Sequence, residues 1–257
     1  MATSRILARI REGRPARLAS LWTVPHWKIV EMMALAGFDG VWIEMEHSDF
    51  TWEQMSQAIL AARAHGMDAM VRVPRRGYTD IIRPLEAGAA GVLVPQITSV
   101  AEAREFTRMA RFAPLGWRGI GGSVDTHYGR ISLPEYVENA QQETFCALMI
   151  ERREVVEEIE TIAAIEGMDG VFVGPVDLSQ SYNILGQTGH SLIEAAIERV
   201  AAACAARGKW WGTLASTPEA IRRRFAQGAR FFMLGGEVEA LTSGFRAALD
   251  RFEGIGP

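Results

Sequence analysis

Short apolar runs alternate with longer helix-like segments along the chain, and this alternation leaves few folds open to it. The runs are rich in β-branched and aromatic residues. Such a pattern is typical of repeated βα units around a parallel sheet. The expected strands are Arg17–Trp22, Gly40–Glu44, Ala69–Val73, Gly91–Val94, Phe145–Ile150, Gly170–Val173, Trp210–Leu214 and Arg230–Leu234. Eight units in 257 residues match an α/β fold of the (β/α)8 TIM barrel type.

A repeated glycine pattern supports this count. Four segments begin with a glycine and lead into the second, fourth, sixth and eighth strands. Their first residues are Gly37, Gly88, Gly167 and Gly228. We expect each glycine to end a helix in a left-handed conformation, before a short turn into a strand buried on both faces.

Three segments fall outside the eight units. A helix is expected before the barrel at Ser4–Glu12, and the segment Leu241–Phe252 has an amphipathic pattern. The Gly-rich stretch Ala113–Pro134, called here the 113–134 excursion, is predicted to be a long loop with a function or a subunit contact. The chain is thus predicted to be one barrel domain over residues 1–257 that forms a homo-oligomer.

The charge and the cysteine content of the chain limit the classes of partner that we expect. The formal net charge is −4 and charges of both signs are scattered, which predicts neither a nucleic-acid partner nor a membrane surface. Cys146 and Cys204 make no disulfide framework or metal-binding pair. The first residues are interrupted by arginines and no run of 18 apolar residues occurs, so we expect a cytoplasmic protein that acts on small molecules.

Polar residues follow the expected strands where catalytic groups stand in TIM barrels, at the C-terminal ends of the strands. These residues are Trp22, Glu44 with Glu46 and His47, Arg72, Gln96, Glu151, the segment Gly174–Asp177, Leu214 and Glu237. The sequence therefore predicts that several acidic and basic groups converge on one mouth.

Glu151 and Asp177 follow neighbouring strands and are candidate ligands of a hard divalent cation. Mg²⁺ or Mn²⁺ commonly takes one or two protein carboxylates and leaves its other positions to water and substrate. The alternative is structural: Glu151 pairs with an arginine such as Arg72 or Arg153, and Asp177 caps the helix that follows. Both interpretations stay open at this point.

His47 and Arg72 are candidate catalytic residues. A loop imidazole at the mouth can take or give a proton, although it can also simply bond to the backbone. A guanidinium at the end of an apolar strand must find an anion or a carbonyl. That partner is either a substrate or a buried carboxylate, Glu44 or Glu151, and the two can coexist before substrate binds.

Some chemistries are set aside on the sequence. A Schiff-base aldolase needs a lysine inside the barrel, yet Lys28 falls in a helix and Lys209 precedes the seventh strand. Acidic residues in Gly235–Glu239 oppose a phosphate site there. The stretch Gly119–Ser123 lacks the spacing of a dinucleotide loop.

Several motifs resemble those of the metal-dependent class II pyruvate aldolases of the 4-hydroxy-2-oxoheptanedioate aldolase (HpcH/HpaI) type. The resemblance runs from about Gly13 to Ala248, and its most specific part is Gly-Pro-Val-Asp-Leu-Ser after the sixth strand. The motifs are Ile43–His47, Val71–Pro74, Val92–Pro95, Arg118–Gly121, Met149–Arg152 and Gly170–Ser179.

The resemblance implies a role for each matching residue. Glu151 and Asp177 would bind Mg²⁺, Mn²⁺ or Co²⁺, His47 would be the acid/base, and Arg72 would stabilise an enolate. The backbone at Gly174, Pro175, Val176 and Asp177 would hold the pyruvate carboxylate, and Trp22 and Leu214 would line the aldehyde pocket. The family also implies a hexamer of barrels with a C-terminal helix exchanged between subunits.

Three positions depart from the family pattern. Met149 replaces a glutamine that contacts substrate, and Glu44 replaces an aspartate before the Glu-His pair. Glu86 replaces an aspartate credited with raising the basicity of the histidine. We expect Glu86 at the far end of its helix, where it reaches a mouth only across a subunit boundary. The loop Val124–Arg130 also differs in detail.

The resulting hypothesis is a reversible cleavage of a 4-hydroxy-2-oxo acid to pyruvate, or a related 2-oxo acid such as hydroxypyruvate, and an aldehyde. One alternative is an acyl-CoA lyase of the citrate and malyl-CoA lyase group, for which Arg75 and Arg76 are the one basic candidate. The other is a non-catalytic barrel that binds a 2-oxo acid, which Met149 alone supports.

Overall fold

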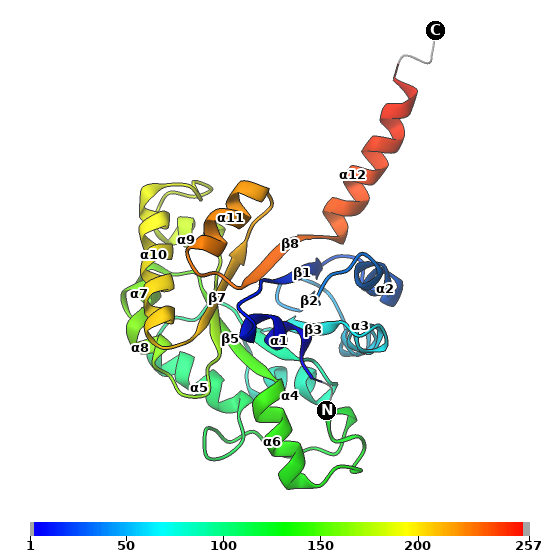
Figure 1. Ribbon diagram of the computed structural model, residues 1–257, viewed down its shortest axis with the longest axis vertical. Coiled ribbons are helices and arrows are strands. Elements are labelled where there is room, and N and C mark those ends of the chain that lie inside the picture. The colour runs from blue at the N-terminus through cyan, green and yellow to red at the C-terminus, as the bar shows by residue number, and fades with distance from the viewer. Residues whose placement is uncertain (1–2, 254–257) are drawn as a thin grey trace.

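The computed structural model describes residues 3–253, and eight parallel strands close into a barrel within it (Figure 1). Each strand pairs with the next, and β8 pairs with β1. The strands are β1 Ala16–Leu21, β2 Gly40–Glu44, β3 Asp68–Arg72, β4 Gly91–Val94, β5 Phe145–Ile150, β6 Gly170–Val173, β7 Trp210–Leu214 and β8 Phe231–Gly236. The predicted (β/α)8 fold is confirmed.

The helices lie around the barrel. They are α1 Arg5–Arg11, α2 Trp27–Leu35, α3 Trp52–Ala64, α4 Tyr78–Glu86, α5 Val100–Ala110, α6 Leu133–Glu143, α7 Arg153–Glu157, α8 Ile159–Ala163, α9 Pro175–Ser181, α10 Ser191–Ala206, α11 Pro218–Ala226 and α12 Glu237–Leu249. Hydroxyl groups of Ser or Thr cap the N-termini of several of them, as at Thr51 and Thr217. The glycines of the repeated pattern have positive φ as expected: Gly37 (92°), Gly88 (95°), Gly167 (83°) and Gly228 (98°).

Three strands differ from their expected limits. β1 ends at Leu21 instead of Trp22, because the backbone N–H of Trp22 donates to the Glu237 carboxylate (2.9 Å) rather than to a strand. β3 starts one residue early at Asp68, whose N–H donates to the carbonyl of Asp39 beside β2 (3.1 Å). β8 runs on to Gly236, which pairs with Ser20 after a register shift.

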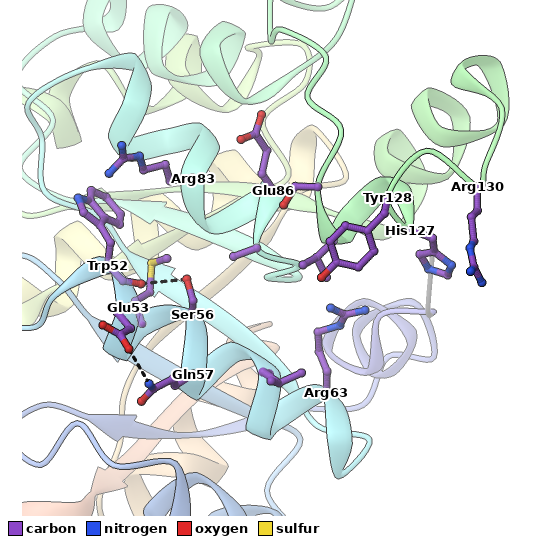
Figure 2. A pocket seen from close by; sticks show the side chains of 15 residues that line it. Trp52, Glu53, Ser56, Gln57, Arg63, Arg83, Glu86, His127, Tyr128 and Arg130 are labelled. Atoms are coloured by element: carbon purple, nitrogen blue, oxygen red, sulfur yellow. Dashed lines mark hydrogen bonds between the residues drawn. The ribbon is translucent and has the colours of Figure 1, made fainter.

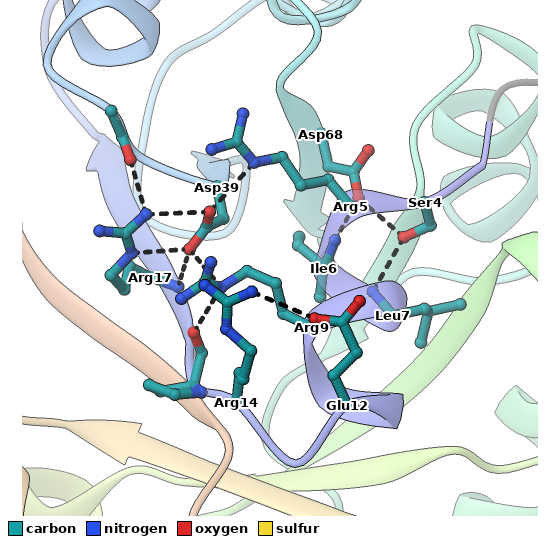
Figure 3. Close-up of polar contacts among 12 residues, drawn as sticks. Ser4, Arg5, Ile6, Leu7, Arg9, Glu12, Arg14, Arg17, Asp39 and Asp68 are labelled. Carbon is teal, nitrogen blue, oxygen red and sulfur yellow. Dashed lines mark hydrogen bonds and ion pairs between the residues drawn. The ribbon is translucent and has the colours of Figure 1, made fainter.

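Helix α1 closes the N-terminal end of the barrel. Its Ile6 and Leu7 are buried in the cluster of side chains that fills the barrel interior. Polar contacts also bind the same helix to the start of the strands (Figure 3). The Asp68 carboxylate accepts hydrogen bonds from the Ser4 hydroxyl (2.7 Å) and the Ile6 N–H (2.8 Å).

Asp39 forms the central ion pairs among these contacts. Its fully buried carboxylate lies within 3.1 Å of the Nε atoms of Arg5, Arg9 and Arg17. Burial alone would raise the pKa of Asp39, but hydrogen bonds from Arg17 and the arginine charges outweigh burial and hold the pKa below its ordinary value. The carboxylate therefore stabilises the folded chain at neutral pH.

Replacement of this carboxylate is expected to destabilise the fold. Asp39→Ala should lower the free energy of unfolding by roughly 2–4 kcal/mol, because it leaves several guanidinium groups around a buried site without their anion. Urea unfolding at pH 7 measures the loss. Because the folded-state pKa is lowered, the contribution of Asp39 is present above the unfolded-state pKa and is lost as pH falls through the folded-state value.

Arg14 provides the matched control. It forms an ion pair with the exposed Glu12 at 3.3 Å and makes none with Asp39 in the part of the chain that the structure describes. Arg14→Ala should change the free energy of unfolding by about 0.5 kcal/mol or less. An equal loss for both variants would contradict the role given to Asp39.

The 113–134 excursion is held in place rather than left without structure. It contains a short 3-10 helix, Val124–Thr126, and it ends in the start of α6. The buried Arg118 guanidinium donates to the Asp125 carboxylate (2.9 Å) and to the Tyr136 hydroxyl oxygen (3.0 Å), and the Tyr136 hydroxyl donates to Asp125. A buried ion pair therefore pins the excursion to α6.

Helix α12 projects away from the barrel (Figure 1). Phe245 and Leu249 on this helix are 66% and 72% exposed, as an amphipathic segment without a covering partner would be. No helix within residues 3–253 combines the length and apolar character needed to cross a membrane.

Candidate active site

The ends of β2 and β3 are joined by a buried ion pair. The Glu44 side chain is fully buried, and its Oε2 accepts from Arg72 Nε (2.5 Å) and from Trp42 Nε1 (3.2 Å). Its Oε1 accepts from the backbone N–H groups of Glu46 (2.8 Å) and His47 (3.0 Å). Of the partners considered for Arg72, Glu44 is the one found. Glu44 uses both oxygens to orient Arg72 and the loop after β2, so we interpret it as a positioning residue.

Arg72 is held on several sides and keeps one free donor. Its guanidinium carbon lies 5.1 Å from the centre of the Trp22 ring and 5.5 Å from that of Trp42. Its Nη1 lies 3.4 Å from Glu46 Oε2 and 3.8 Å from Met149 Sδ. Its Nη2 is buried and has no hydrogen-bond partner within the described residues. A fixed cation with an unused donor is suited to an anionic ligand.

Glu151 has another polar atom at this end of the barrel that is unused within the described residues. Its Oε2 accepts from the Gln96 N–H (2.7 Å), whereas its buried Oε1 has no partner within residues 3–253. Burial raises the pKa of Glu151 to about 7, and the Asp177 and Glu46 carboxylates add to that effect, while Gln96 and Arg72 counteract it. The expected alternative of an arginine partner for Glu151 is not found among the ion pairs of the described residues.

Asp177 lies in the first turn of α9, directly after β6. The structure places Gly174 at the N-cap, so Asp177 is not the capping residue, although its acidic side chain in the first turn is favourable to the helix dipole. Gly174 permits the approach of Glu151, since a Cβ at this position would lie 2.9 Å from Glu151 Cγ. Together, Glu151 and Asp177 bring two carboxylates to adjacent strand ends.

These residues fit a divalent cation. Glu151 offers a buried oxygen that has no partner among the described residues, and the Glu46 and Asp177 charges both raise the pKa of Glu151. A cation would offset that repulsion, and two carboxylates are a sufficient protein contribution for Mg²⁺. Within residues 3–253, no group of three His, Cys, Asp or Glu side chains is close enough to hold a metal.

His47 stands at the mouth with its ring accessible. The side chain is 56% exposed, and its Nε2 lies 3.5 Å from Glu46 Oε2. The ring stacks on Trp22 at a centroid distance of 6.3 Å and an interplanar angle of 16°. In the described part of the chain the ring bonds to no backbone group, so the structural alternative is not supported. Its position suits proton transfer.

Glu46 is the residue to which the sequence interpretation gave no role. Its carboxylate lies close to both Arg72 and His47. Burial raises the pKa of Glu46, and the Glu44 and Asp177 charges add to this effect, whereas the Arg72 and His47 charges lower the pKa. The available signal was its place between Glu44 and His47 after β2. Spacing alone did not show that its side chain turns back toward Arg72.

The expected substrate-binding residues divide into an inner and an outer set. Met149 is buried beside Arg72, in the inner cluster. Pro175, Val176 and Leu214 line a cavity of about 490 Å³ between α9, α10, β7, α11 and β8, and Val176 and Leu214 are partly exposed. At the start of α9, Pro175 has no N–H and the Gly174 N–H donates to the Ile150 carbonyl (3.2 Å), which leaves the N–H groups of Val176 and Asp177 available to an anion.

Glu86 lies apart from this group, as expected for the last residue of α4. It lines a groove of about 1000 Å³ between α3, α4 and the 113–134 excursion (Figure 2). The groove also contains His127, Tyr128 and Arg130. Burial raises the pKa of Glu86, and the Asp125 charge adds to this, while Arg118 and Arg83 oppose it. The structure does not bring Glu86 into the mouth of its own barrel.

Comparison with known proteins decides the family. The model of the HpcH/HpaI aldolase/citrate lyase family matches residues 23–243. The chain belongs to this family. It is 30% identical to a hydroxypyruvate/pyruvate aldolase of Pseudomonas aeruginosa, over 100% of this chain and 96% of that protein. It is also 30% identical to a 4-hydroxy-2-oxo-heptane-1,7-dioate aldolase of Escherichia coli, over 95% of this chain and 93% of that protein.

A solved structure agrees with this membership. The HpcH/HpaI aldolase from Desulfitobacterium hafniense superposes with a TM-score of 0.91 at 29% identity, and 98% of each chain is covered. The expected class of enzyme, a carbon–carbon lyase of the aldolase type, is confirmed. Arg75 and Arg76, the basic pair considered for coenzyme A, form ion pairs with Glu102 (2.5 Å) and Asp80 (3.0 Å), and the aldolase relatives fit the acyl-CoA alternative less well.

Proposed function

We propose that this family member is a divalent-metal-dependent aldolase that reversibly cleaves a 4-hydroxy-2-oxo acid to an aldehyde and pyruvate, or a related 2-oxo acid such as hydroxypyruvate. The observation that carries the proposal is that Glu151 Oε1 and Arg72 Nη2, both buried and without a hydrogen-bond partner among the described residues, lie at one mouth. They supply a cation ligand and a fixed positive charge, which are what an enolate of a 2-oxo acid requires.

Glu151 and Asp177 would hold Mg²⁺, Mn²⁺ or Co²⁺. When bound, the ion would act as a Lewis acid on the 2-oxo acid. In the direction of cleavage, His47 takes the proton from the hydroxyl at C4. The C3–C4 bond then breaks, its electron pair forms the enolate, and C4 leaves as the aldehyde carbonyl. Arg72 stabilises the enolate charge, and the enolate gains a proton at C3 to become the 2-oxo acid.

The substrate is held by residues around this centre. The backbone N–H groups of Val176 and Asp177, which follow Gly174 and Pro175 and have no acceptor within helix α9, bind the carboxylate of the 2-oxo acid. Trp22 and Leu214 bound the space for the aldehyde. Met149 offers Arg72 a sulfur contact rather than an amide, so the carbonyl of the substrate depends more heavily on Arg72.

A coupled assay of pyruvate release tests the proposal. A panel of 4-hydroxy-2-oxo acids is offered with each of the three ions, and lactate dehydrogenase with NADH reports pyruvate. We expect ion-dependent release from at least one member of the panel. Binding of pyruvate without turnover of any member would favour the non-catalytic barrel instead.

We also propose a cytoplasmic homo-oligomer, a hexamer in keeping with the family resemblance. The apolar side chains of the projecting α12 support this, among them Phe245 and Leu249. Glu86, which the resemblance pairs with the acid/base histidine, would serve a mouth only from a neighbouring subunit.

Light scattering is expected to give a mass near six times 28.3 kDa. Phe245→Glu should reduce this mass, because it places a charge on the apolar face of α12, whereas Arg251→Glu beyond the helix should not. A wild-type monomer of 28.3 kDa at micromolar concentration would contradict the assembly.

A further inference from the structure

Glu237, the first residue of α12, binds the loop that follows β1. Its Oε1 accepts hydrogen bonds from the backbone N–H groups of Trp22 (2.9 Å), Thr23 (2.5 Å) and Val24 (3.1 Å). Three successive N–H groups thus surround one carboxylate oxygen, although more than 200 residues separate the two segments. Glu237 is 3% exposed, so this contact is shielded from solvent.

No cation balances this carboxylate within the described residues. Glu237 takes part in none of the ion pairs formed by residues 3–253, and its second oxygen, Oε2, is buried without a hydrogen-bond partner there. Its charge is therefore stabilised by the backbone dipoles of the loop. Hydrogen bonds to a charged acceptor are roughly twice as strong as neutral ones, and three of them fix the loop backbone firmly.

The loop residue that matters for chemistry is Trp22. Its ring lies 5.1 Å from the Arg72 guanidinium and stacks on the ring of His47. Trp22 has already left the β1 ladder, because its N–H donates to Glu237. The position of the indole, between the cation and the acid/base candidate, is thus set by Glu237 rather than by the strand.

We propose that Glu237 is a positioning residue of the lyase reaction, which acts through Trp22 on Arg72 and His47. Three backbone hydrogen bonds hold the indole at the distance where it supports both groups. The proposal rests on the proposed function for its kinetic consequences, while the placement of Trp22 is a structural claim that can be measured separately.

A double-mutant cycle tests the kinetic consequence. Glu237→Ala and Trp22→Ala should each lower kcat for pyruvate release by roughly 10-fold to 10²-fold, as small misplacements of catalytic groups do. Because both changes act through the same side chain, the double variant should be no slower than Trp22→Ala. Glu237→Gln keeps an oxygen acceptor and should recover part of the loss. Multiplicative losses in the double variant would overturn the proposal.

A spectroscopic measurement tests the placement without turnover. The near-ultraviolet circular dichroism difference between wild type and Trp22→Phe reports the ordered indole of Trp22. In the Glu237→Ala background, the same Trp22→Phe change should produce little difference. Glu253→Ala, an exposed residue beyond the same helix, should leave the difference intact. An undiminished Trp22 signal in Glu237→Ala would overturn the proposal.

The two tests separate the proposal from the function on which it rests. If the wild-type protein releases no pyruvate from the panel, the proposed function fails, and the dichroism result still decides whether Glu237 fixes Trp22. If the wild-type protein is active and Glu237→Ala matches it in kcat, the function stands and the role of Glu237 fails. Should Glu237→Ala not fold, Glu237→Gln, which weakens the three hydrogen bonds by removing the charge, should show a smaller loss of kcat and a partly reduced Trp22 dichroism signal, and wild-type values of both would overturn the proposal.

Discussion

Removal of divalent ions with a chelator is expected to abolish pyruvate release, and added Mg²⁺, Mn²⁺ or Co²⁺ is expected to restore it. The reason is the arrangement of Glu151 and Asp177, which offers two carboxylates and one buried oxygen that has no partner within residues 3–253. A cation supplies several kcal/mol of charge stabilisation to such a transition state, which corresponds to a loss of about 10³-fold or more without it. The coupled assay with and without chelator measures this loss.

Glu151→Gln should lose ion binding and activity together. The amide preserves the volume of the side chain but removes the charge that a hard cation requires. Isothermal titration with Mn²⁺ measures binding apart from turnover. Glu154→Gln, an exposed change three residues later, is the matched control and should bind the ion like wild type. Full activity of Glu151→Gln in the presence of chelator would contradict the site.

The second large effect is expected at Arg72 and His47. His47→Ala should lower cleavage by about 10²-fold to 10⁴-fold, the usual share of a positioned acid or base. Arg72→Ala should cost at least as much, and Arg72→Lys should not restore full activity, because a point charge does not reproduce the planar guanidinium held by Glu44. Steady-state kinetics of the three variants measure these losses.

Replacement of His47 and replacement of Arg72 should also differ in their effect on the affinity for pyruvate. His47→Ala leaves Arg72 in place, so affinity for pyruvate should change little, whereas Arg72→Ala should weaken affinity as well as rate. Arg72→Ala leaves the buried Glu44 carboxylate without its cation, which can destabilise the fold. The double variant Arg72→Met with Glu44→Gln removes both charges and serves as a control for stability. Wild-type turnover of His47→Ala across the pH range would return that histidine to a structural role.

The convergence of Glu44, Arg72 and Glu151 was predictable because parallel strands of a closed barrel all end at one face. Apolar runs define those ends well where the strand is buried on both sides, as in β5, so the next residue is placed correctly. The position of Glu86 away from the mouth was predictable for the same reason, because the helix that follows a strand ends at the opposite face of the barrel.

Side-chain contacts between distant segments were not predictable. Glu237 was interpreted only as an acid unfavourable to phosphate, although it binds the Trp22 loop and thereby ends β1 early. Glu46 turns toward Arg72, a choice of rotamer that spacing along a loop does not determine. Tertiary contacts of this kind depend on packing around the whole barrel, whereas the periodicity of a sequence reports only local burial.

The exchange of the methyl protons of pyruvate for deuterium tests the central claim most directly, because it needs no knowledge of the aldehyde. In the direction of synthesis the enzyme must remove a proton from C3 of pyruvate to form the enolate. Incubation in D₂O followed by proton NMR should show exchange that requires both the wild-type protein and a divalent ion, and that chelator or Arg72→Ala suppresses. Exchange no faster than with the ion alone, while the ion and pyruvate are bound, would contradict the account.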